Sequence, residues 1–163
     1  QEHLFASDLF PVLPPIEWCN LATSGSDNVI PVGQGGQMLT FPLEHPGGSL
    51  GFRIDWPNYS MAYVTDTTAD LEADYLQHIT DVDLLLHECY FRDEYREFAL
   101  RSGHSWTTPV VEVAKAANVG QLVLIHINPL DESDDPVDLA KARSIFPNTV
   151  VAYDGMEIEF VCQ

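Results

Sequence analysis

The sequence predicts an α/β fold in which helices cover one outer face of a mixed β-sheet. Apolar runs of strand length in the middle of the chain alternate with segments of helical periodicity. Pairs of runs that resemble β-hairpins lie before and after this alternating region. The chain has 163 residues, of which 45% are hydrophobic, and this is enough for one domain with its own core.

Residues 1–36 are expected to form an irregular lead-in, because prolines and glycines interrupt them repeatedly. Within this segment, short strands are expected at residues 16–21 and near residues 29–32. The chain begins with Gln1 rather than Met, so we expect that it does not begin at a natural start. Residues 1–163 are treated as one partial domain, whose regular part is residues 37–163.

The first regular segment, residues 37–43, is predicted to be a strand. Residues 49–55 and 60–65 then form a predicted hairpin, since Pro57 between them is well suited to a tight turn. A short amphipathic helix is expected over residues 70–79, where apolar side chains recur at helical spacing.

Further along the chain, helices and strands alternate before a closing hairpin. A proline in the first turn favours a helix that starts at Thr108-Pro109, and Asp154-Gly155 favours a tight hairpin turn. The remaining predicted elements are a buried strand at 82–87, a helix at 92–100, a strand at 122–127, a helix at 136–146, and hairpin strands at 149–153 and 156–161.

Composition excludes several classes of protein. Seven Lys+Arg against 25 Asp+Glu give a net charge of −18, which disfavours binding of long nucleic acid. No apolar run approaches the roughly 18 residues of a membrane span, so no membrane partner is expected. The three cysteines are widely spaced and form no CxxC motif, which favours a reducing cytoplasm, with Cys89 filling a buried strand end.

Three residues that can bind a metal lie at or near the ends of predicted strands. His45 follows the strand at 37–43, Asp66 follows the apolar run that ends at Val64, and His126 stands at the end of the last buried run. A lone histidine after a strand is most often structural, and an aspartate between two threonines is most often a turn or helix cap. Together, however, imidazole and carboxylate groups at strand ends suit zinc, manganese or iron.

Three other residues could take part in the same chemistry. His87 ends a buried run, Glu88 adjoins it, and His104 lies in the loop before the helix that begins at Thr108. A carboxylate can bridge two metal ions, and such a pair stabilises charge in a displacement at phosphorus or carbon. A histidine held near an acid can deliver a proton to the leaving group.

These residues lie in short motifs whose order and spacing resemble metallo-β-lactamase-fold hydrolases. The similarity covers about residues 37–161 and is greatest to the ribonuclease Z-like and cyclic-phosphodiesterase branch. It implies that the chain is the C-terminal half of an αββα sandwich. The motifs are Leu43-Glu-His45-Pro-Gly-Gly-Ser-Leu-Gly-Phe-Arg, Ala62-Tyr-Val-Thr-Asp66-Thr, Asp83-Leu-Leu-Leu-His87-Glu-Cys-Tyr, Gly103-His104-Ser-Trp, Leu122-Val-Leu-Ile-His126 and Asp154-Gly-Met-Glu-Ile-Glu-Phe160.

The resemblance implies a role for each candidate residue. His45 would bind one divalent metal ion, Asp66 would bridge both ions, and His126 would bind the second. His104 would protonate the leaving group with Glu88 as its partner, while His87 would support the site from behind. Zinc is the expected metal, with manganese or iron as alternatives, and metal-bound hydroxide would attack a small or cyclic phosphodiester.

The chain departs from this family in one respect. The motif His-x-His-x-Asp-His, which supplies about half of the family's metal ligands, is absent from the 163 residues. The N-terminal half could be missing from this chain, could be a separate chain, or could have been lost together with catalysis. We therefore expect weak or no metal occupancy in this chain, and either a homodimer or association with the missing half.

Three alternatives to a small phosphodiester remain open. The intact protein could process transfer RNA, which ranks lower because of the negative charge, or it could act on esters, thioesters or lactones. From a different class, the chain could be a non-catalytic half-domain that works through protein–protein contacts.

Overall fold

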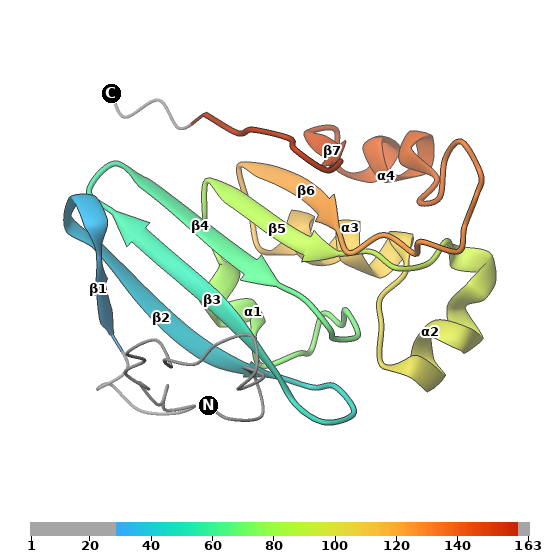
Figure 1. Cartoon of the computed structure of the whole chain (residues 1–163), viewed down its shortest axis with the longest axis horizontal. Coiled ribbons are helices and arrows are strands. Elements are labelled where there is room, and N and C mark those ends of the chain that lie inside the picture. The colour runs from blue at the N-terminus through green and yellow to red at the C-terminus, as the bar shows by residue number, and fades with distance from the viewer. Residues whose placement is uncertain (1–28, 160–163) are drawn as a thin grey trace, which may run out of the picture.

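The computed structural model describes residues 29–159, which form one seven-stranded mixed sheet with strands in sequence order (Figure 1). The pairs β1–β2, β2–β3 and β3–β4 are antiparallel, whereas the pairs β4–β5, β5–β6 and β6–β7 are parallel. This confirms the predicted mixed sheet. The strands are β1 (Ile30–Val32), β2 (Gly36–Leu43), β3 (Ser49–Trp56), β4 (Tyr59–Val64), β5 (Leu84–Glu88), β6 (Gln121–Ile125) and β7 (Thr149–Val151).

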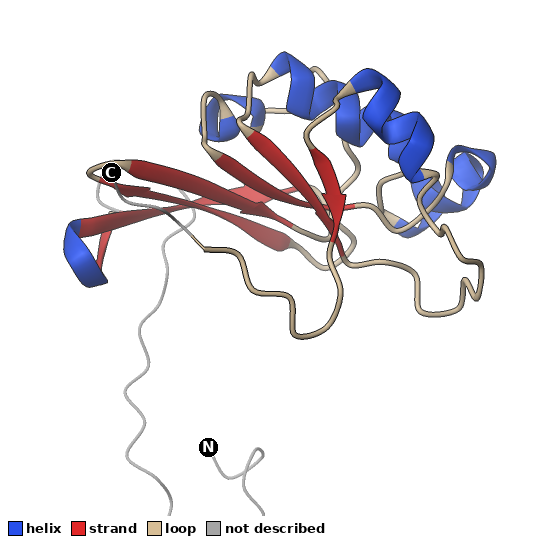
Figure 2. Cartoon of the chain, turned by 90° about the horizontal axis from the view of Figure 1, so that it is seen from above, coloured by secondary structure: helices blue, strands red, loops and turns tan. Residues whose placement is uncertain are grey.

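The helices gather on one side of the sheet, as the sequence predicted (Figure 2). They are α1 (Leu76–Ile79), α2 (Arg96–Ser102), α3 (Thr107–Ala116) and α4 (Leu139–Ile145), with the 3-10 turn η2 (Asp93–Tyr95). A second 3-10 turn, η1 (Gly33–Gly35), lies apart from them between β1 and β2 (Figure 2). Val110, Val113 and Ala114 of α3 are fully buried with Leu85 of β5 and Leu122 of β6, so the main core lies between this helix and the parallel strands.

The predicted hairpin is formed by β3 and β4, which pair from Trp56 and Tyr59 outward. On the other edge of β3, Gly51 lies opposite Phe41 of β2. A Cβ atom at Gly51 would come within 2.2 Å of the Phe41 ring, so the glycine makes room for this fully buried side chain.

The predicted helix over residues 70–79 is wrong in length, because α1 forms only its last turn. The Asp70 carboxylate accepts a hydrogen bond from the Glu72 backbone N–H at 2.9 Å, and this local bond competes with a helical start. Tyr75 and Ile79 are buried as the periodicity predicted, but Leu71 is exposed. His78 on α1 is half-buried and stacks on the Phe41 ring.

Two C-terminal predictions are also corrected. The helix expected from Pro136 begins at Leu139, because the Asp138 side chain caps it by accepting from the Lys141 N–H. The turn at Asp154-Gly155 forms, but residues 156–159 are not a strand, so the closing hairpin is absent from the described residues.

Strand direction determines where the candidate residues lie. Because β3 is antiparallel to both β2 and β4, these two strands run in the same direction, and β5 and β6 run parallel to β4. The carboxyl ends of β2, β4, β5 and β6 therefore share one edge of the sheet, where ligands bind in open α/β sheets.

Within residues 29–159, no helix has the length and apolar character needed to span a membrane. The strand expected at 16–21 lies outside the described residues.

Candidate metal centre

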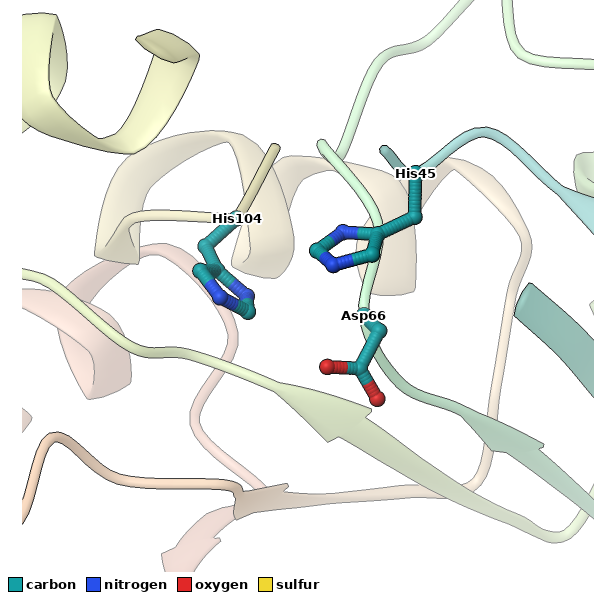
Figure 3. A group of neighbouring side chains, drawn as sticks. All are labelled: His45, Asp66 and His104. Atoms are coloured by element: carbon teal, nitrogen blue, oxygen red, sulfur yellow. The ribbon is translucent and has the colours of Figure 1, made fainter. Parts of the chain in front are cut away.

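Three candidate side chains meet at this edge of the sheet, and they come from three separate segments (Figure 3). His45 follows β2, Asp66 follows β4, and His104 lies in the loop between α2 and α3. One ligand atom from each lies within 4.8 Å of the others. Two imidazole nitrogens and one carboxylate oxygen at this separation suit zinc, manganese or iron, so the residues fit the metal that the sequence predicted.

His126 adjoins this group from the end of β6. Its Nε2 lies 3.5 Å from Asp66 Oδ1, and its ring centroid is 5.3 Å from that of His104. The sequence grouped His126 with His45 and Asp66, whereas the structure places His104 in the tightest group and His126 beside it. All four side chains nonetheless belong to one cluster.

The backbone is unusual at two of these positions. Asp66 has a φ of 51° and His126 a φ of 52°, so both lie in the left-handed region. Non-glycine residues there cost on the order of 1–3 kcal/mol and persist only where the surrounding structure requires them. Such strain at the ends of two rigid strands is typical of side chains that must point in a particular direction.

The His45 ring is oriented by Gly103. The His45 Nδ1 lies 2.9 Å from the Gly103 carbonyl oxygen, which can only accept, so Nδ1 carries the proton and Nε2 is free to bind a metal. Gly103 has a φ of +77°, and a Cβ atom there would lie 2.4 Å from Pro46 Cδ. Glycine is therefore required for this close approach of the two loops.

Glu88, at the end of β5, holds the His104 loop in place. Its carboxylate is fully buried and accepts hydrogen bonds from the Thr67 N–H at 2.6 Å and the Ser105 N–H at 3.0 Å. The His104 Nδ1 lies 3.1 Å from the same carboxylate, so Nε2, on the other side of the ring, points away from Glu88. Burial raises the pKa of Glu88 above its usual value, although these three hydrogen bonds partly offset the shift.

His87 lies behind the cluster rather than in it. Its Nδ1 donates to the Glu88 carbonyl oxygen at 2.7 Å, so its Nε2 accepts from the Tyr75 hydroxyl at 3.0 Å. Burial lowers the pKa of His87 to about 4, and the ring is neutral at pH 7. The expected position in support of the site agrees with these contacts.

Tyr90 is a neighbour of the cluster that the sequence analysis gave no role. Its ring stacks on His104 with centroids 4.6 Å apart, and it lies 5.3 Å from the ring of His126. Backbone N–H groups of Tyr90 and Phe91 both donate to the Ser105 carbonyl, which fixes this wall of the site. The only signal in the sequence was an aromatic residue two positions after Glu88.

Comparison with known proteins establishes the family. Residues 9–127, more than half of the chain, match the family model described as the beta-lactamase superfamily domain. The chain therefore belongs to the beta-lactamase superfamily. The α/β fold and the ribonuclease Z-like resemblance drawn from the motifs are both confirmed.

Individual relatives share these features over part of their length. A ribonuclease Z from Synechococcus sp. (strain CC9902) is 40% identical over 108 residues, which is 63% of this chain and 33% of that protein. The metallo-beta-lactamase fold protein YhfI from Bacillus subtilis superposes with a TM-score of 0.69 at 22% identity, over 82% of this chain and 53% of that one. The short form of human tRNase Z gives a TM-score of 0.62 at 21% identity, over 76% and 43%. The chain thus spans about a quarter to a third of the curated relatives it matches.

Proposed function

We propose that this chain forms one wall of a two-metal centre in a hydrolase that cleaves phosphodiesters. The observation that carries the proposal is the convergence of His45, Asp66 and His104, with His126 beside them, at the carboxyl edge of the sheet. In this proposal His45 holds one ion, Asp66 bridges two, and His126 holds the second. Such ions, when bound, activate water and neutralise charge that develops at phosphorus.

His104 is proposed to protonate the leaving oxygen. Its Nδ1 faces the Glu88 carboxylate, which fixes the ring, while Nε2 is available to the substrate. The His104 side chain is 15% exposed, so it is partly shielded from water yet open on one side. The short distance from His104 to His45 and Asp66 also suits a metal ligand, and the experiment below separates the two roles.

The substrate is proposed at the level of the phosphodiester bond. The preference for a small substrate expected from the sequence receives no support from the relatives, of which several are named ribonuclease Z. RNA is therefore included in the proposal, even though the net charge of −18 disfavours it over most of the surface.

The centre requires ligands from outside this cluster, and the open face of the sheet suggests where they come from. Arg53 of β3 donates to the carbonyls of His78 and Thr80 on the helix-covered side, so its neighbours Phe52 and Ile54 point to the other side. They are half-buried, as is Tyr63 opposite Phe52. We propose that this apolar face packs against a second sheet, in the missing half or in another copy of the chain.

Hydrolysis of bis(p-nitrophenyl) phosphate by the intact protein that contains this chain, supplied with Zn²⁺ or Mn²⁺, tests the proposal. Asp66→Asn should abolish hydrolysis, because it removes the bridging charge. His104→Ala should lower the rate by about 10²–10⁴-fold while the bound metal is retained, as expected for a proton donor. His78→Gln, in a histidine remote from the cluster, is the matched control and should retain the parental rate.

Each result has a clear reading. If His104→Ala loses the metal together with the activity, His104 is a ligand and not the proton donor. If Asp66→Asn is as active as the parent, the metal assignment fails. Failure of the chain alone is expected, because the centre requires ligands from outside this cluster. An intact protein that neither binds metal nor hydrolyses the substrate favours the second function, a non-catalytic half-domain that acts through its open sheet face.

A further inference from the structure

A continuous series of aromatic rings leads from the metal centre to the surface of α2. It begins at His104, which stacks on Tyr90 with centroids 4.6 Å apart, and Tyr90 contacts Phe91 at 4.9 Å. Phe91 lies 6.2 Å from Tyr95, and Tyr95 lies 6.4 Å from Phe98. These contacts join the loop after β5 to η2 and α2; Figure 1 shows α2 at one end of the sheet. We call Tyr90, Phe91, Tyr95 and Phe98 the aromatic track.

The outer rings of the track are exposed. Phe98 is 58% exposed and Tyr95 is 37% exposed, although both belong to a helical segment that could have turned them inward. Large apolar side chains that cluster on a surface in this way mark an interaction site more often than scattered ones do.

Arginines accompany the track. The guanidinium of Arg92 lies 5.8 Å from the Tyr95 ring centroid, and that of Arg101 lies 4.8 Å from the Phe98 ring centroid. Arg96 lies over Trp106, two residues after His104. These are three of only seven basic residues in the chain.

The charge of this segment differs from that of the remaining chain. Its three arginines are balanced by Asp93, Glu94 and Glu97, so residues 92–101 are neutral and the other residues carry the whole net charge of −18. Residues 92–101 therefore repel a polyanion less than the average of the chain does, although Asp131 of the acidic loop lies beside Arg92. Arg92 is also paired with Glu94 and Asp131, whereas no ion pair is found for Arg96 or Arg101 within the described residues.

We propose that the aromatic track is a binding surface for single-stranded nucleic acid, along which bases next to the scissile phosphodiester stack. Exposed aromatic rings stack with bases of any sequence, and arginines beside them contact the phosphates. The proposal rests on the phosphodiesterase function above and assigns its substrate to a class, a single-stranded polynucleotide. The arginines and the connection to His104 favour this occupant over an apolar protein surface.

Binding without hydrolysis tests the proposal directly. Fluorescence anisotropy would follow a labelled single-stranded RNA of about eight nucleotides added to the purified chain in EDTA, which removes metal and prevents cleavage. Phe98→Ala should weaken binding by about 5–100-fold, the loss of one stacked base. Phe98→Leu should weaken it similarly, because it keeps an apolar side chain and removes only the aromatic face.

The arginines are tested by salt. Arg101→Ala should reduce the slope of log affinity against log salt by about 0.7, the value for one phosphate of a single strand. Lys115→Ala removes an exposed cation from α3, away from the track, and should leave this slope unchanged. Both variants should hydrolyse bis(p-nitrophenyl) phosphate at the parental rate, since this small substrate does not reach α2.

Three outcomes would overturn the proposal. The parent could fail to bind the RNA, or Phe98→Ala could bind it as well as the parent does. Phe98→Ala could instead change the oligomeric state in sedimentation while RNA binding stays the same, which would make the track a protein interface. Because hydrolysis of the small substrate is measured separately, each of these leaves the phosphodiesterase proposal standing.

Discussion

Replacement of Glu88 by glutamine should destabilise the fold measurably, because Glu88 holds together the loops that carry the site. One carboxylate oxygen accepts from the Thr67 N–H and faces His104 Nδ1, while the other accepts from the Ser105 N–H. An amide has only one oxygen, so its NH₂ group must face at least one of these donors. A buried N–H left without an acceptor costs about 1–3 kcal/mol.

Glutamine is uncharged, so the variant avoids the cost of burying a carboxylate, which raises the pKa of Glu88 in the parent. This gain offsets part of the cost of the unpaired N–H. We expect Glu88→Gln to lower the free energy of unfolding by about 1–3 kcal/mol, and Tm by about 2–4 °C for each kcal/mol. Urea unfolding followed by circular dichroism measures the change as a shift in midpoint at constant slope. Glu72→Gln, at an exposed position, is the control. A Glu88→Gln variant as stable as the parent would refute the reasoning.

Two further predictions concern the surroundings of the site. The pKa of His87 is lowered to about 4 in the folded state. Below about pH 6.5 the unfolded chain therefore binds a proton that the folded chain does not. The free energy of unfolding should fall by up to about 3 kcal/mol between pH 6.5 and 4. His87→Gln should lose this dependence in urea unfolding at several pH values, and a parent whose stability is flat over that range contradicts it. Gly103→Ala should destabilise the chain more than Gly155→Ala, because both have positive φ but only the first would collide with Pro46. Equal losses in thermal unfolding would show that the close approach does not matter.

The part of the site that lies on strands could be predicted from the sequence. An apolar run that ends at a polar side chain identifies both a buried strand and the residue at its edge, which is why Asp66 and His126 were found. Because β2, β4, β5 and β6 all end at one edge, residues far apart in the chain meet in space, as Asp66 and His126 do across 60 positions. No local pattern gives the distances between them, so the sequence did not show that His104 lies closer to His45 and Asp66 as a group than His126 does.

The remaining features depend on contacts that local sequence does not encode. His104 enters the cluster because the Glu88 carboxylate binds the backbone of the next residue, a contact between loops 17 residues apart. Residues 70–75 have helical periodicity, but the Asp70 side chain bonds locally and shortens the helix to one turn. The aromatic track likewise needs the folded positions of η2 and α2, since its rings follow no regular spacing in the sequence.

The central claim is that His45, Asp66, His104 and His126 line a metal centre. Paramagnetic line broadening by Mn²⁺ in two-dimensional NMR of the chain tests it most directly, because broadening locates even a weakly held ion. We expect low Mn²⁺ to broaden the resonances of these residues selectively, and Asp66→Asn to abolish this effect. Broadening confined to the acidic loop at residues 131–135, or unchanged in Asp66→Asn, would contradict it.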